Sequence, residues 1–133
     1  TFYQLEGLMV GEDVSLASLK AVLKEALSRI FKEDVEMRIR PGYFPFVEPG
    51  LEIDIACTIC NGVKCPACKH TGWLEMLGSG MIHPEVLRHG GVDPEKYSGF
   101  AFGIGVTRLA MMKYKIDDVR HFMSGDMRFL EQF

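Results

Sequence analysis

The sequence predicts an α+β fold in which helices flank one antiparallel β-sheet. Stretches with the two-residue alternation of strands follow one another along much of the chain. The one long stretch with helical spacing of apolar residues lies near the start. Strands in succession with helices held to one side are typical of α+β folds, whereas strict alternation of strands and helices would indicate a parallel sheet.

Composition indicates a globular domain, or a large part of one. The chain has 133 residues, of which 47% are hydrophobic and 25% charged. Its net charge of −3 lacks the basic excess of a protein that grips nucleic acid by itself. No apolar stretch approaches the ~20 residues of a membrane helix, so no membrane association is predicted. Because the chain starts at Thr1 rather than Met, we expect essential parts of the parent protein to lie upstream.

The first two predicted elements are a strand over residues 2–10 and a helix from Ser15 to about Phe31. Gly7 interrupts the strand and is expected to form a bulge. Ser15 is suited to cap the helix, in which leucines recur at helical spacing. The apolar side of this helix is expected to cover one face of the sheet.

The middle of the chain reads as strands around residues 35–39, 51–55 and 73–82. Residues 41–50 are expected to form an extended segment punctuated by prolines. The cysteine-rich stretch that follows residue 55 is expected at the tip of a hairpin.

Helices dominate the remainder of the prediction. Pro84 and Pro94 are each expected to begin a short helix, because proline suits the first helical position. Residues 99–104 read as a strand that feeds a helix over 105–114, and residues 117–123 as a last short helix.

The segment Gly103-Ile-Gly-Val-Thr-Arg108 begins like the dinucleotide fingerprint G-x-G-x-x-G. Its sixth position is an arginine, which argues against a Rossmann site because the third glycine permits close helix–strand packing there. A strand-to-helix junction with an arginine in the first turn can instead present a guanidinium to a phosphate. The alternative is a glycine-rich turn with an exposed arginine.

Two pairs of side chains stand two residues apart. Phe44 and Phe46 would point to the same side of an extended chain and flank an aromatic ligand; ordinary core packing is the alternative. Gln4 and Glu6 would share one face of a strand, where a carboxylate beside an amide can hold an ammonium group. A solvated polar face is the alternative for this pair.

All four cysteines lie in one short stretch as two Cys-x-x-Cys pairs: Cys57, Cys60, Cys65 and Cys68. This spacing without a secretion signal predicts a structural Zn²⁺ site with four protein ligands in a reducing compartment, the cytoplasm. Reduced thiols on a surface hairpin are the alternative, and an iron–sulfur cluster fits the spacing less well. His70 is a spare candidate ligand.

Four segments together carry a family resemblance: Tyr3–Gly7 (YQLEG), Tyr43–Pro49 (YFPFVEP), Gly78–Pro84 (GSGMIHP) and Gly99–Ala110 (GFAFGIGVTRLA). In this order they closely resemble the alpha subunits of bacterial-type phenylalanyl-tRNA synthetases, and the likeness continues to Phe133. It implies a class II aminoacyl-tRNA synthetase-like antiparallel sheet flanked by helices. Residues 1–133 would be the C-terminal part of that catalytic core, with 57–68 as a zinc-knuckle insertion.

The resemblance also implies a role for each candidate residue. Gln4 and Glu6 would bind the α-amino group of phenylalanine, and Arg108 would contact ATP phosphates. Glu48 would bind Mg²⁺ near a subunit boundary. The full set implied to form the phenylalanine pocket is Gln4, Glu6, Phe44, Phe46, Val47, Ala101 and Gly103.

The implied activity is ATP-dependent formation of phenylalanyl-adenylate, followed by transfer of phenylalanine to tRNA(Phe). The implied partners are L-phenylalanine, ATP, tRNA(Phe) and a beta subunit in an α2β2 enzyme. Without the upstream parts, the 133 residues alone are expected to be inactive. The alternatives are a synthetase-like binding or regulatory module without catalysis, and a zinc-dependent interaction module.

Overall fold

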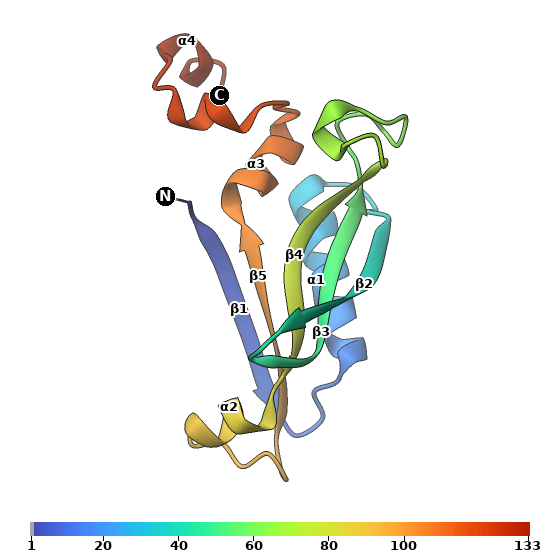
Figure 1. The fold of residues 1–133 in the computed structure, drawn as a ribbon, viewed down its shortest axis with the longest axis vertical. Coiled ribbons are helices and arrows are strands. Elements are labelled where there is room, and N and C mark those ends of the chain that lie inside the picture. Colours follow the sequence, from blue (N-terminus) through green and yellow to red (C-terminus); the bar gives the residue numbers. More distant parts are fainter. Residues whose placement is uncertain (1) are drawn as a thin grey trace.

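The computed structural model describes residues 2–133, apart from the side chain of Ala67. Five strands form one antiparallel sheet in the order β1-β5-β4-β3-β2 (Figure 1). The strands are β1 (Gln4–Gly11), β2 (Met37–Phe44), β3 (Val47–Ala56), β4 (Trp73–Ile82) and β5 (Ser98–Gly105). The predicted α+β class with an antiparallel sheet is therefore confirmed.

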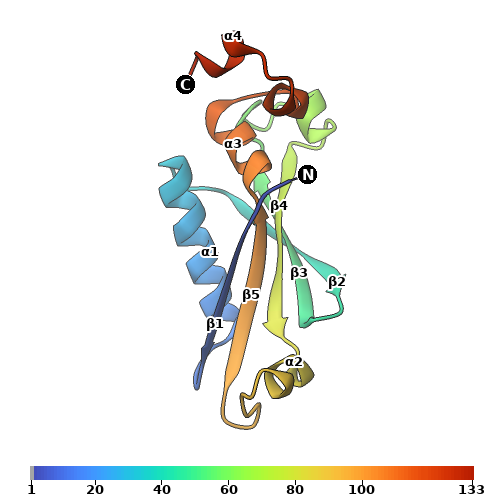
Figure 2. The same ribbon diagram turned by 90° about the vertical axis from the view of Figure 1, so that its left-hand side faces the viewer.

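Helix α1 (Leu16–Phe31) covers one face of the sheet, as predicted (Figure 2). The Ser15 side chain accepts a hydrogen bond from the backbone N–H of Ser18, and the Ser18 side chain accepts one from the backbone N–H of Ser15. These two bonds satisfy donors at the helix start. Spacing of three to four residues places the buried leucines on one side of the helix: Leu19, Leu23 and Leu27.

The remaining helices are short. They are α2 (Pro84–His89), α3 (Val106–Tyr114), α4 (Met127–Leu130) and two 3-10 helices at Pro66–Cys68 and Val119–Met123. The prediction of a helix beginning at Pro94 is wrong. This segment forms a turn instead, in which the carbonyl of Asp93 accepts hydrogen bonds from the N–H groups of Lys96 and Tyr97. Helix α4 has no counterpart in the sequence-based prediction. Within residues 2–133, none of the helices has the length and apolar character that spanning a bilayer demands.

The bulge expected at Gly7 is also wrong. Strands β1 and β5 pair without a register shift, and Gly7 lies opposite Phe102. A Cβ atom at Gly7 would come within 2.5 Å of the Phe102 ring. Gly7 therefore makes room for an aromatic ring rather than for an extra residue.

Residues 41–50 are paired more fully than the predicted extended segment. Strand β2 continues to Phe44, the chain turns at Pro45 and Phe46, and β3 returns beside β2 from Val47. Because β2 is an edge strand, Pro41 is tolerated within it.

The two faces of the sheet differ sharply. Side chains on the α1 side form the core, which includes Ile53, Leu77, Phe100 and Ile104 together with the α1 leucines. The alternate residues point to the other face, where β1 and β5 place Glu6 opposite Gly103. Small residues and charged residues gather on this second face, which carries the candidate site.

Candidate functional site

A cavity of about 420 Å³ opens on the face of the sheet opposite α1. Its volume falls within the roughly 300–1,000 Å³ of ligand pockets. The structure brings to its lining all of the residues that the sequence suggested for phenylalanine: Gln4, Glu6, Phe44, Phe46, Val47, Ala101 and Gly103.

One wall of the cavity is aromatic. The rings of Phe44 and Phe46 lie with their centroids 6.1 Å apart and their planes 26° from parallel. Glycine lets the Phe44 ring approach β4 closely, because a Cβ atom at Gly78 would come within 2.8 Å of that ring. Val47 is buried beside them. This wall suits a flat apolar group.

The opposite wall is polar. Gln4 and Glu6 project from β1 over the backbone of Gly103. A Cβ atom at Gly103 would lie 3.4 Å from Gln4 Nε2 and 3.8 Å from Glu6 Oε1, so the absence of a side chain keeps the space beneath both groups open. A carboxylate and an amide that converge at the edge of an apolar pocket can bind an ammonium group.

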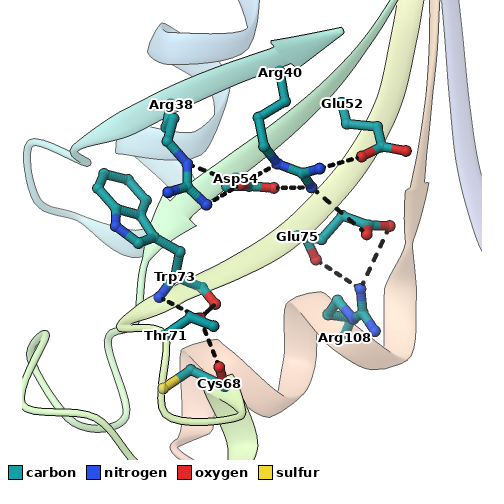
Figure 3. Close-up of polar contacts among 9 residues, drawn as sticks. All are labelled: Arg38, Arg40, Glu52, Asp54, Cys68, Thr71, Trp73, Glu75 and Arg108. Carbon is teal, nitrogen blue, oxygen red and sulfur yellow. Dashed lines mark hydrogen bonds and ion pairs between the residues drawn. The ribbon is translucent and has the colours of Figure 1, made fainter. Parts of the chain in front are cut away.

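A charged cluster adjoins the cavity on the same face (Figure 3). Gly78, which lines the cavity, lies opposite Glu52, and Glu52 forms an ion pair with Arg40. Asp54 is buried, with 2% of its side chain exposed. Arg40 donates from Nε and Nη2 to Asp54 at 2.6 and 2.8 Å, and Arg38 donates to Asp54 Oδ2 from Nη2 at 2.6 Å. Hydrogen bonds from Arg40, and secondarily from Arg38, hold the pKa of Asp54 below its usual value despite its burial.

Arg108 joins this cluster from the first turn of α3. Its Nη1 donates to the backbone carbonyl of Glu75 at 2.7 Å and lies 3.9 Å from the Glu75 carboxylate. Arg40 Nη2 lies 3.9 Å from the same carboxylate. Half of the Arg108 side chain, 51%, is exposed, so it is accessible to an anion on the open face.

Glu48 lies apart from both groups. Its side chain is 75% exposed and its Oε2 is 3.3 Å from Nε2 of His83. Glu48 is not among the residues that line the cavity. Six positions of β3 separate it from Asp54, roughly 20 Å of extended chain.

The four cysteines converge at the tip of the β3–β4 hairpin, as predicted. We call residues Cys57–Gly72 the knuckle. Its four sulfur atoms lie within 4.8 Å of one another, and Sγ–Sγ distances of 3.8 Å (Cys57–Cys65) and 3.9 Å (Cys60–Cys68) match the ~3.8 Å edge of a tetrahedron with Zn–S bonds of about 2.3 Å. Among residues 2–133, this is the one group of three or more potential ligands, and it does not include His70.

The surroundings of the cysteines shift the pKa values of two of them in opposite directions. Backbone N–H groups of Cys65 and Gly72 point at Cys68 Sγ from 3.2 and 3.4 Å, and they lower the pKa of Cys68 to about 6. Burial raises the pKa of Cys57 to about 12. A bound metal would overcome that penalty, because thiolates bind metals in their deprotonated form.

Gly78 and Asp54 are among the residues of this face that sequence reasoning missed. Gly78 had a signal, since a glycine inside a strand often marks a close approach of another group. Asp54 had none, because an acidic residue in an alternating strand reads as solvent-facing. Its burial depends on Arg38 and Arg40, which only the register of β2 and β3 places beside it.

Comparison with known proteins identifies the relatives of the chain. The chain is 58% identical over 132 residues to "Phenylalanine--tRNA ligase alpha subunit" of Francisella tularensis subsp. novicida, which covers 99% of this chain and 39% of that protein. The protein of the same name from Leptospira biflexa is 54% identical, over 100% of this chain and 39% of that protein. The one from Roseiflexus castenholzii is 58% identical, over 99% of this chain and 38% of that protein. The chain thus spans about two fifths of the length of these relatives.

A family model described as "tRNA synthetases class II core domain (F)" matches residues 1–133. The match covers every strand of the sheet, both walls of the cavity and the knuckle. The chain therefore belongs to the family of class II tRNA synthetase core domains of this type.

Proposed function

We propose that this chain is the C-terminal part of the catalytic core of a phenylalanine–tRNA ligase alpha subunit, and that its cavity binds L-phenylalanine. The observation that carries the proposal is the cavity itself, which has an aromatic wall facing a carboxylate and an amide. An amino acid with a flat apolar side chain complements both walls.

In this proposal, Phe44 and Phe46 hold the benzyl ring, with Val47 and Ala101 beside it. Gln4 and Glu6 bind the α-amino group. These contacts hold the amino acid at both ends and so limit the directions its carboxylate can take. The backbone of Gly103 leaves room beneath the amino group.

The proposed reaction joins this carboxylate to ATP. A carboxylate oxygen attacks the α-phosphorus, the bond from that phosphorus to the bridging oxygen breaks, and pyrophosphate leaves. No protein nucleophile is required, so catalysis rests on alignment and on stabilisation of phosphate charge. Arg108, half exposed on the same open face, is the proposed phosphate ligand. The activated phenylalanine then passes to tRNA(Phe).

Glu48 is the proposed Mg²⁺ ligand. It supplies one exposed carboxylate, and Mg²⁺ in proteins is often held by one or two carboxylates together with water or substrate oxygens. Because Glu48 lies roughly 20 Å along β3 from Asp54, we propose that an ion held there is separate from the phosphates at Arg108. Mg²⁺ that accompanies ATP neutralises phosphate charge when bound.

Zn²⁺ is the proposed occupant of the knuckle. The sulfur separations fit a tetrahedral tetrathiolate, and four protein ligands leave no position for a substrate. The ion would therefore be structural. Such a thiol cluster belongs in a reducing compartment, and we propose the cytoplasm.

The proposed partners are a beta subunit, in an α2β2 assembly, and tRNA(Phe). The net charge of −3 supports the view that other parts of the enzyme supply most of the affinity for tRNA. The remaining three fifths of the relatives' length leaves ample chain for that task.

Calorimetric titration of the complete enzyme with L-phenylalanine tests the proposal, with tyrosine and leucine as competitors. Glu6→Gln should weaken phenylalanine binding by about tenfold or more, because it removes a charge-assisted hydrogen bond to the ammonium group. Glu12→Gln is the matched control, since Glu12 is exposed and pairs with Lys96 at 3.6 Å.

Equal binding by the Glu6 and Glu12 variants would contradict the assigned pocket. Selective binding without phenylalanine-dependent ATP–pyrophosphate exchange would favour a non-catalytic synthetase-like module.

A further inference from the structure

We propose that the knuckle positions the nucleotide end of the site, and that Thr58 is the residue through which it does so. The inference rests on the proposed function, because it assumes that Arg108 contacts ATP. It adds a task for the knuckle that is distinct from holding the fold together: a metal ion in the knuckle would set the affinity for ATP.

Helix α3, which carries Arg108, has few apolar anchors. Met112 is its one buried residue, and Leu109 packs partly against the core. Its first N–H, that of Val106, donates to the carbonyl of Tyr3 at 2.9 Å. A helix of this length is marginal by itself, so its orientation depends on the groups that hold its ends.

The β3–β4 hairpin contacts α3 near both ends. Near the start, Arg108 Nη1 donates to the carbonyl of Glu75 on β4 at 2.7 Å. Near the end, the Thr58 hydroxyl donates to the carbonyl of Met112 at 3.3 Å. Carbonyl groups in the last turn of a helix lack donors within the helix. The Met112 carbonyl therefore accepts hydrogen bonds from outside the helix, one from the N–H of Lys115 and one from the hydroxyl of Thr58.

Hydrogen bonds and the chain itself connect both contacts to the cysteines. Thr58 follows Cys57 directly, and the N–H of Cys57 donates to the carbonyl of Gly72 at 2.9 Å, which closes the base of the knuckle. On the other side, the Thr71 hydroxyl donates to the carbonyl of Cys68 at 2.7 Å and accepts the N–H of Trp73 at 3.2 Å. Figure 3 shows this connection from Cys68 to Trp73.

From Trp73 the connection continues to the charged cluster. The Arg38 guanidinium lies 4.6 Å from the centre of the Trp73 ring, and Asp54 joins Arg38 to Arg40. Arg40 in turn faces the Glu75 carboxylate beside Arg108. Four thiolates drawn onto one ion would therefore order Thr58 at one end of α3 and Glu75 at the other.

The test uses the complete enzyme with its partner subunit, assayed by ATP–pyrophosphate exchange. Thr58→Val removes the hydroxyl and keeps the shape, whereas Thr58→Ser keeps the hydroxyl. We expect Thr58→Val to raise the KM for ATP about three- to tenfold, the range of one neutral hydrogen bond. The KM for phenylalanine should stay within about twofold, and Thr58→Ser should behave like the wild type.

Removal of zinc should act in the same direction as Thr58→Val. Chelation is expected to raise the KM for ATP more than the KM for phenylalanine, and added zinc is expected to restore it. A KM for ATP that is the same in Thr58→Val and Thr58→Ser would overturn the proposal, as would a parallel rise in both KM values. If removal of zinc unfolds the enzyme, the comparison of the KM for ATP between Thr58→Val and Thr58→Ser tests the proposal by itself. Failure of the proposed function looks different, since the wild type would then show no phenylalanine-dependent exchange.

Discussion

The ring of Phe44 rests on the backbone of Gly78, so closely that a Cβ atom added to Gly78 would lie 2.8 Å from Cζ of the ring. Phe44 ends β2 and Gly78 lies on β4, with β3 between them. This contact crosses a whole strand and sets the position of the aromatic wall of the cavity.

Gly78→Ala should therefore damage the cavity more than the fold. The added methyl group pushes the Phe44 ring outward, which we expect to weaken phenylalanine binding about tenfold and to lower the free energy of unfolding by about 1–3 kcal/mol. Calorimetry and denaturant unfolding measure the two effects. Gly90→Ala is the control, because its φ of −80° suits alanine and the nearest atoms are 3.4 Å away. Binding as tight in the Gly78 variant as in the Gly90 variant would show that Phe44 does not touch the ligand.

Ala101→Gly should widen the specificity of the enzyme. Ala101 lines the cavity, and loss of its methyl group leaves space for a substituent on the ring. We expect para-substituted phenylalanines to gain about tenfold or more in kcat/KM relative to phenylalanine, the scale of one methyl group in an apolar pocket. Adenylation assays with these analogues measure the ratio.

Ala21→Gly removes the same methyl group from an exposed position of α1 and controls for general loosening. An unchanged ratio in the Ala101 variant would place the ring elsewhere in the cavity.

Asp54→Asn should destabilise the protein by about 2–3 kcal/mol at neutral pH, because it weakens the hydrogen bonds of two arginines to a buried charge. Asp34→Asn is the control: Asp34 forms an exposed ion pair with Lys24, and its loss should change stability by less than about 0.5 kcal/mol. Denaturant unfolding distinguishes the two variants.

The same residue predicts a pH dependence. The pKa of Asp54 is lowered in the folded state, first of all by Arg40, so its contribution is complete above the unfolded value of about 3.9. The contribution is lost as the pH falls through the folded-state pKa. The wild type should then lose more stability below about pH 4 than Asp54→Asn. Parallel curves for the two proteins in that range would argue against a depressed pKa.

The knuckle should bind one divalent ion per chain. Co²⁺ is expected to give the absorption of a tetrahedral tetrathiolate, and Zn²⁺ is expected to displace it. Cys60→Ser should weaken metal binding by more than about tenfold. Loss of a residue that only hydrogen-bonds to a metal ligand already costs about that much, and Cys60 would be a ligand itself. His70→Asn should leave the spectrum unchanged, since His70 is outside the group of sulfur ligands. A spectrum altered by the His70 variant and not by the Cys60 variant would require a different ligand set.

Local spacing was sufficient for several features of this protein. The leucines of α1 recur along the sequence and lie together in the core, and the two Cys-x-x-Cys pairs meet at a hairpin tip as their spacing suggests. Gln4 and Glu6 share a strand face because side chains alternate along any strand. Each of these inferences needs only residues that are close in the sequence.

Pairing between distant strands decided the rest. Between β3 and β4 the register shifts at Ile53 and Asp54, so Met76 has no partner of its own and both Met76 and Leu77 enter the core. Glu75, rather than Met76, then stands beside Asp54 on the open face. Simple alternation along β4 would place Glu75 on the same side as Leu77, and so away from the charged cluster.

The sequence by itself thus determined which residues make the elements and which types of ligand group are available: an aromatic pair, an amide beside a carboxylate, four thiols. Spacing alone could not show that β1 and β2, at opposite edges of the sheet, contribute to one cavity, which only the family resemblance implied; the contact of Arg108 with Glu75 was decided by the tertiary structure alone. The physical reason is that periodicity acts over a few residues, whereas register, bulges and close contacts such as that of Phe44 with Gly78 arise when strands distant in the chain pack against a shared core.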